Sequence, residues 1–131
     1  MDELLFNDKF NKSYNKDEVI FFEGSVGRHM YVINSGTVNI VKKISGRNEV
    51  IATLGKGSIF GEMALIDDMP RSASVIVAED GTSVLEIDHA LFIYLVGQQP
   101  AFALVILKTL SMRFRAQMSS SVADREKAGR E

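Results

Sequence analysis

The sequence predicts a mainly β fold with flanking α-helices, in which an antiparallel sandwich or jelly-roll barrel is followed by helices. Between residues 17 and 87, short segments rich in β-branched and aromatic residues alternate with glycine turns at intervals of roughly ten residues. After residue 88 the apolar residues recur at spacings of three and four, which is the period of an amphipathic helix. These patterns leave open whether the β region is a jelly roll or another sandwich.

The β region is preceded by a mixed, polar segment, and we expect a short lead-in helix over about 1–16. Three turn segments then carry residues that tolerate positive φ: Asn34-Ser35-Gly36, Ser45-Gly46-Arg47-Asn48 and Glu79-Asp80-Gly81. The first of them predicts a hairpin between the strands on either side. Strands are expected over 19–23, 30–33, 38–41, 50–54, 73–78 and 83–87.

Two helices are predicted over about 88–123, after a barrel of about 17–87. Asp88 is a suitable N-cap for the first helix, over about 89–97, and Pro100 suits the start of the second. The charged residues 124–131 are expected to fray as a polar tail. We interpret the whole chain, 1–131, as a single domain of ordinary length.

The second predicted helix carries one apolar stripe. Its members are Ala103, Leu107, Leu110, Phe114 and Met118. The stripe predicts a homodimer contact through the last four of these residues. The alternative is that the stripe lies back on the barrel of the same chain.

The composition excludes several classes of function. The chain has no cysteine, so disulfides, thiolate metal sites and cysteine-ligated iron–sulfur clusters are ruled out. His29 and His89 lie far apart in the sequence without an evident third ligand, so neither a metal nor a haem is expected, and each histidine is interpreted as structural or exposed. A net charge of −2 does not favour binding to nucleic acid, which is itself negatively charged.

The sequence predicts a soluble, cytoplasmic protein without a membrane anchor. The N-terminus is acidic and lacks the apolar region of a signal peptide. An uncharged run over 90–107 is interrupted by Gly97-Gln98-Gln99-Pro100, and each half is too short to cross a bilayer. Two helices joined by a turn explain this run better than a transmembrane span.

The most informative stretch is residues 60–75, which read FGEMALIDDMPRSASV. Arg71 offers a planar fork of donors that can bind two phosphate oxygens, and burying it without an anionic partner would be costly. Gly61 opens a short helix whose first N–H groups can bind the remaining oxygens. Glu62 is an acceptor that suits a sugar hydroxyl. Alternatively, Arg71 is exposed or paired with nearby aspartates, Gly61 is an ordinary turn glycine, and Glu62 only complements the helix dipole.

This stretch closely resembles the phosphate-binding cassette of cyclic-nucleotide-binding domains, the sensor modules of catabolite-activator-like regulators, nucleotide-gated channels and kinase regulatory subunits. The family pattern is F-G-E-hydrophobic-A-L, a short spacer, then P-R-S/T/A-A, and it is matched nearly position for position. The resemblance covers about residues 15–118 and includes Phe22-Glu23-Gly24, Ser35-Gly36 and Leu54-Gly55. It implies an eight-stranded antiparallel jelly-roll barrel (a double-stranded β-helix) with flanking helices.

The resemblance also implies the site residues. A phosphate is expected at Gly61, Met63, Arg71, Ser72 and Ala73, and a ribose at Glu62. Serine after the arginine favours adenine in this family, so the expected ligand is cAMP, although another 3′,5′-cyclic nucleotide remains open. A residue of the C-terminal helix covers the base in the family, and Gln117 and Met118 are the candidates for this lid.

These features predict a regulatory sensor domain, not an enzyme, that binds a cyclic nucleotide without a cofactor and signals by re-packing its C-terminal helices. Its downstream protein partner cannot be named. The chain ends at Glu131 without a basic recognition helix, so direct nucleic-acid binding is not expected. One alternative is a degenerate domain of the same fold that dimerises or binds proteins without a nucleotide. A cupin-like metalloenzyme is a third reading, which the two distant histidines argue against.

Overall fold

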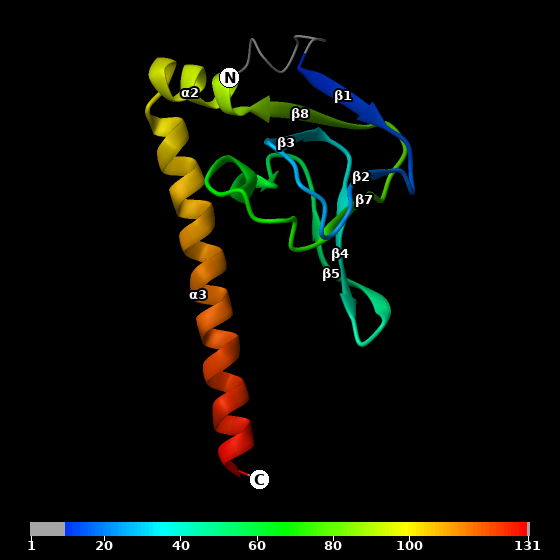
Figure 1. Ribbon diagram of the computed structural model, residues 1–131, viewed down its shortest axis with the longest axis vertical. Coiled ribbons are helices and arrows are strands. Elements are labelled where there is room, and N and C mark those ends of the chain that lie inside the picture. The colour runs from blue at the N-terminus through cyan, green and yellow to red at the C-terminus, as the bar shows by residue number, and fades with distance from the viewer. Residues whose placement is uncertain (1–9, 131) are drawn as a thin grey trace. The chain divides into compact units, whose positions relative to one another are not determined.

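The computed structural model describes residues 10–130 (Figure 1). It contains two units, one reaching to Tyr94 and one beginning at Leu95, and each is described by itself. The strands of the first unit are β1 (Asn11–Tyr14), β2 (Val19–Phe21), β3 (His29–Ser35), β4 (Val38–Ile44), β5 (Arg47–Leu54), β6 (Ile59–Phe60), β7 (Ser74–Val77) and β8 (Thr82–Asp88).

The strands form two four-stranded antiparallel sheets, with the orders β1-β8-β3-β6 and β2-β7-β4-β5. Sequence neighbours such as β2 and β3 therefore lie in different sheets, as expected of a jelly roll. The prediction of a mainly β, jelly-roll-like fold followed by C-terminal helices is confirmed.

The core of the first unit lies on the facing sides of strands from both sheets. The register pairs Val38 with Val77 and Ile40 with Val75 across β4 and β7. Because side chains alternate along a strand, these inward positions are two residues apart and are filled by β-branched residues. The buried cluster consists of Tyr31, Ile33, Val38, Phe60, Val75, Val77 and Val84.

The hairpin between β4 and β5 is tighter than predicted. Only Ser45 and Gly46 lie between the strands, with φ of 53° and 80°. Two consecutive positive φ values fit the twist of a two-residue hairpin, so Arg47 and Asn48, expected in the turn, extend β5 instead.

The predicted lead-in helix over 1–16 is wrong for its second half. Residues Asn11–Tyr14 form β1, which pairs with β8 from Leu85 to Thr82. Asparagine, serine and tyrosine are weak helix formers, and β8 offers an unpaired edge whose hydrogen bonds override local preference. Residues 1–9 of that prediction lie outside the described residues.

The helices begin where the sequence predicts. Helix α2 (His89–Gln98) follows β8 directly, and the Asp88 carboxylate accepts the N–H of Leu91 at 2.8 Å, as an N-cap should. Helix α3 (Ala101–Arg130) starts after Pro100. It continues through most of the segment expected to fray, where alanine, glutamate, lysine and arginine are good helix formers.

Within the described residues, no single helix is both long and apolar enough to cross a membrane. Helix α2 and the first part of α3 are long and apolar enough only when taken together, and the chain is bent between them.

Candidate functional site

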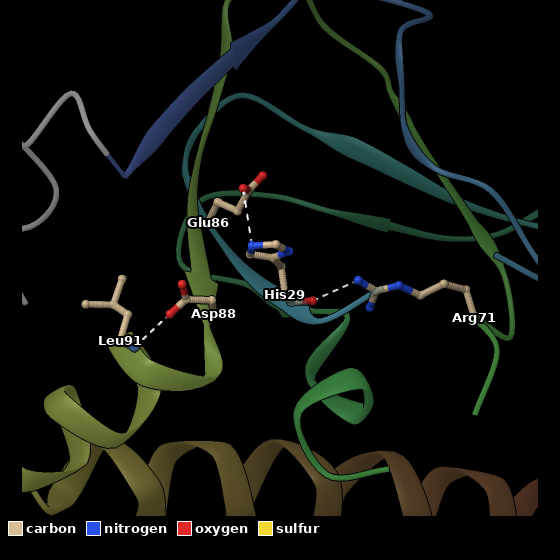
Figure 2. Close-up of polar contacts among 5 residues, drawn as sticks. All are labelled: His29, Arg71, Glu86, Asp88 and Leu91. Atoms are coloured by element: carbon tan, nitrogen blue, oxygen red, sulfur yellow. Dashed lines mark hydrogen bonds and ion pairs between the residues drawn. The ribbon is translucent and has the colours of Figure 1, made fainter. Parts of the chain in front are cut away.

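The site is organised around Arg71, whose side chain is 8% exposed. Its Nη1 donates to the carbonyl oxygen of Gly61 at 2.9 Å, and its Nη2 donates to the carbonyl oxygen of His29 at 2.8 Å. Figure 2 shows the second of these bonds. The alternative that Arg71 is exposed is therefore wrong.

Residues of both sheets hold the Arg71 guanidinium. Its Cζ lies 4.0 Å from the ring centroid of Phe21 on β2, a cation–π geometry. The Phe21 ring is itself 6.0 Å from the Tyr31 ring, and Tyr31 stacks on Phe60 at 5.0 Å. An aromatic wall that continues into the core therefore fixes one face of the guanidinium.

The backbone of Arg71 is also held. Its N–H donates to the carbonyl of Ser25 at 2.8 Å, and its carbonyl accepts the N–H of Gly24 at 2.8 Å. This pair of bonds ties the end of the cassette (residues 60–75) to the loop between β2 and β3. Arg71 is consequently fixed at both its main chain and its side-chain tip.

One donor of the guanidinium is not used. Among the described residues, the buried Nε of Arg71 has no hydrogen-bond partner. Burial lowers the pKa of the Arg71 guanidinium, while Tyr31 and Glu62 act in the opposite direction. Since arginine keeps its charge in proteins, this is a buried cation with a spare donor, which an anion would satisfy.

Gly61 begins the cassette in the left-handed region, with φ of 74°. The single 3₁₀ turn η1 (Glu62–Leu65) follows, and the Gly61 carbonyl accepts both Arg71 Nη1 and the N–H of Ala64. A Cβ on Gly61 would lie 2.8 Å from Arg71 Nη1 and 3.3 Å from Phe21. Glycine is required here by both the backbone conformation and the close approach of arginine.

The remaining predicted residues lie on the same segment. Glu62 is buried, and its charge acts on Arg71. Ala73 is 9% exposed, whereas Met63 and Ser72 are exposed. Of the phosphate and ribose candidates, Gly61 and Glu62 are the ones shown to act on the Arg71 side chain, and the binding roles of all the candidates stay predictions.

The two lid candidates, Gln117 and Met118, are exposed residues of α3 in the second unit. The lid therefore also stays a prediction.

His29 occupies a place that the sequence did not reveal. Its carbonyl accepts a hydrogen bond from Arg71, while its Nε2 lies 3.6 Å from the Glu86 carboxylate on β8, as Figure 2 shows.

The Glu86 carboxylate also affects Tyr31. Burial and Glu86 raise the pKa of Tyr31 to about 12, so this phenol stays protonated and able to donate. Among the residues whose side chains the structure describes, no group of three or more histidine, aspartate or glutamate residues is placed to hold a metal ion.

Gly27 is a second residue of the site that the sequence analysis did not single out. A Cβ at this position would lie 2.5 Å from Arg71 Nη2, 2.9 Å from Nε and 3.0 Å from Cζ. The glycine leaves the space that the guanidinium fills. Only knowledge of the fold, in which the loop after β2 crosses residue 71, could have identified it.

Gly27→Ala is expected to displace the guanidinium, to lower ligand affinity about tenfold and to cost some stability, because the bonds of Arg71 to the Gly61 and His29 carbonyls are disturbed. The clashing atoms belong to the far end of a flexible side chain, so the fold can adjust, but the donors lose their alignment. Calorimetric titration with a cyclic nucleotide measures the loss. Gly55→Ala is the matched control, because its Cβ would meet only Thr37 at an ordinary 4.0 Å. Equal affinities of the two variants would contradict the prediction.

A buried arginine that contacts both sheets of a jelly roll, preceded by a glycine-opened turn, is an arrangement suited to an anion. The sequence of residues 11–99 matches the cyclic nucleotide-binding domain family. The chain belongs to this family.

Individual relatives agree with this assignment. The chain is 33% identical over 103 residues to the cyclic AMP receptor protein of Thermus thermophilus, covering 78% of this chain and 47% of the relative. It is 34% identical over 112 residues to a cGMP-dependent protein kinase of Plasmodium berghei, covering 86% of this chain and 12% of the kinase. The chain thus spans about half, or much less, of the length of these relatives.

A solved structure shows the same fold. The crystal structure of the Thermus thermophilus catabolite activator protein superposes with a TM-score of 0.80 at 29% identity. The superposition covers 94% of this chain and 58% of the other.

Proposed function

We propose that this chain is a regulatory sensor domain that binds a 3′,5′-cyclic nucleotide, with cAMP as the preferred ligand, and releases it unchanged. The observation that carries the proposal is the buried Arg71, whose Nη atoms donate to the carbonyls of Gly61 and His29 and whose Nε has no hydrogen-bond partner among the described residues. A monoanionic phosphodiester supplies the missing charge and acceptors together.

The neighbouring residues support a cyclic nucleotide over a plain anion. Glu62 is an acceptor close enough to influence the charge of Arg71. A carboxylate beside a phosphate site would repel a bare anion, whereas it can accept a ribose hydroxyl on the same ligand. In this proposal Arg71 binds the phosphate, the backbone around Gly61, Met63, Ser72 and Ala73 completes its shell, and Glu62 binds the ribose.

The proposal includes a preference for cAMP over cGMP. Relatives named for both cyclic AMP and cGMP match the chain at similar identity. Ser72, which follows Arg71 and is exposed, has a hydroxyl that can contact the phosphate or the base. In the family that this chain resembles, serine at this position favours adenine as the base.

Calorimetric titration of the purified chain with cAMP, with cGMP as competitor, tests the proposal. Micromolar or tighter binding of cAMP, weakly displaced by cGMP, is the expected result. Stronger displacement by cGMP would reverse the base preference only. Absence of binding by either nucleotide in a folded protein would overturn the proposed function and leave the fold as an interaction module.

The proposed signal is a population shift between two arrangements of the C-terminal helices that hold the ligand unequally. The protein that receives this signal is not identified, and a cytoplasmic location without direct nucleic-acid binding is part of the same proposal.

We also propose that the α3 stripe forms a homodimer contact. Leu107, Phe114 and Met118 are 61%, 62% and 53% exposed, and Leu110 is half-buried. Exposed apolar residues at helical spacing are typical of a helix that pairs with another. Sedimentation at micromolar concentration is expected to show a dimer, and Phe114→Glu is expected to shift it to a monomer. A wild-type monomer with and without ligand would overturn the dimer.

A further inference from the structure

The segment that follows Arg71 is held by a lysine that the family resemblance did not single out. The Nζ of Lys42, on β4, donates to the carbonyl oxygen of Ser72 at 2.7 Å. Lys42 and Ser72 are separated by thirty positions in the sequence. The contact is therefore made by the fold and not by local chain geometry.

By strand alternation, Lys42 lies on the same face of β4 as two core residues of the first unit. Val38 and Ile40 of the same strand pair with Val77 and Val75 and pack in the core of the first unit. Side chains alternate along a strand, so Lys42 continues this inward row. It is partly buried and lies at the end of the row, where the apolar core gives way to the cassette.

The register adds a second link to the cassette. The pairing of β4 with β7 ends with Val41 opposite Ser74, so Lys42 and Ala73, which is 9% exposed, are the next residues at the same end of this ladder. Lys42 thus reaches the Ser72–Ala73 peptide from the end of this ladder, with its ammonium on the carbonyl side.

The bond between Lys42 and the Ser72 carbonyl also determines the orientation of the Ala73 N–H, because both groups belong to the same peptide unit. A trans peptide unit is planar, and its C=O and N–H point in opposite directions. No peptide bond in the described chain is cis. By fixing the Ser72 carbonyl, Lys42 therefore also fixes the direction of the Ala73 N–H, one of the predicted phosphate donors.

Further hydrogen bonds hold residues 71–74, which we call the platform. The N–H of Glu23 donates to the Ser74 hydroxyl at 2.8 Å, and Glu23 Oε1 accepts the backbone N–H of Lys43 at 2.9 Å. Residues 71–74 are thus held by the loop after β2 on one side and by β4 on the other. Within this platform, Lys42 is the cation that acts on the Ser72 carbonyl.

We propose that Lys42 is a positioning residue of the ligand site, which orients the Ser72–Ala73 peptide towards the phosphate and adds a positive charge at the carbonyl of the residue that follows Arg71. This inference rests on the proposed function, because it names a further determinant of the same site. The ligand class is a phosphodiester anion, whose affinity gains from a nearby cation at low ionic strength and loses part of that gain in salt.

The test compares Lys42→Met with Lys43→Met by calorimetric titration with cAMP at low and high ionic strength. Both variants remove the same charge from adjacent positions of β4, but only Lys42 holds the Ser72 carbonyl through its side chain. We expect Lys42→Met to lower affinity about five- to tenfold, because a bond to a charged donor that is partly exposed is worth less than a buried one. Lys43→Met is expected to change affinity less than about twofold, within the range of an exposed charge.

Two further observations separate positioning from a general structural effect. Lys42→Arg is expected to restore most of the affinity, since it keeps a charged donor. The deficit of Lys42→Met is expected to shrink at high ionic strength without vanishing, because salt screens the charge but does not reorient the peptide. Wild-type binding together with equal affinities of Lys42→Met and Lys43→Met would overturn the inference and leave the proposed function intact.

A measurement without nucleotide keeps the inference testable if the proposed function fails. In the ¹H–¹⁵N spectrum of the ligand-free protein, Lys42→Met is expected to shift the Ala73 amide resonance and Lys43→Met to leave it in place. An Ala73 resonance unchanged in Lys42→Met would overturn the positioning role, whether or not the wild-type protein binds a nucleotide.

Discussion

Replacing Arg71 with methionine is expected to lower cyclic-nucleotide affinity at least about tenfold, since a hydrogen bond to a charged group is worth roughly 1.5–3 kcal/mol. Methionine fills much of the same volume, so it tests the charge and the donors more cleanly than alanine would. It also leaves the carbonyls of Gly61 and His29 without their arginine donor. Some loss of stability is therefore expected beside the loss of affinity.

Calorimetric titration gives the affinity, and a thermal melt of the ligand-free variant gives the stability. Arg71→Lys is the informative control, because lysine keeps the charge but lacks the planar fork. If the fork matters, Arg71→Lys binds more weakly than wild type and more tightly than Arg71→Met. A folded Arg71→Met variant with wild-type affinity would show that the phosphate binds elsewhere.

The site could be predicted from sequence only where its residues are close together in the chain. Gly61, Glu62 and Arg71 lie on one segment, so their residue types and spacing were enough to predict a site for a phosphate and a sugar, and these binding roles stay predictions. Phe21, Gly27 and the His29 carbonyl approach Arg71 from strand β2, from the loop that follows it and from the start of β3. No local pattern marks these partners, because their role depends on how the two sheets bring distant segments together.

The same distinction applies to the fold. The N-cap at Asp88 and the start of α3 after Pro100 are local events, and both were predicted correctly. Strand β1 was read as helix, because its conformation is decided by pairing with β8, far along the chain. The resemblance to a known family supplied the jelly-roll topology, which strand periodicity could not select among antiparallel sandwiches.

Gly36 is expected to be the position in the first unit at which a single methyl group costs most stability. It joins β3 to β4 with φ of 84°, a conformation that residues other than glycine adopt at a cost of about 1 kcal/mol or more. A Cβ there would also lie 2.2 Å from Thr82 Oγ1 and 2.7 Å from Thr82 Cα. The second contact involves backbone of β8, so rotating a side chain cannot relieve it.

Thr82 has little freedom to move away. It is fully buried, its hydroxyl donates to the Glu79 carbonyl at 2.7 Å, and it begins the strand that pairs with both β1 and β3. Overpacking a site of this kind costs about 1–3 kcal/mol in addition to the backbone strain. Gly36→Ala is therefore expected to lower the free energy of unfolding by about 2–4 kcal/mol in denaturant titrations.

Gly46→Ala separates the two contributions. Gly46 has a similar φ of 80°, but a Cβ there would meet nothing within 4 Å. This control therefore carries the backbone strain alone, and the difference between the variants measures the clash with Thr82. Equal losses in the two variants would mean that β8 shifts at little cost, and the turn between β3 and β4 would then not fix the spacing of the strands that hold His29 and Glu86.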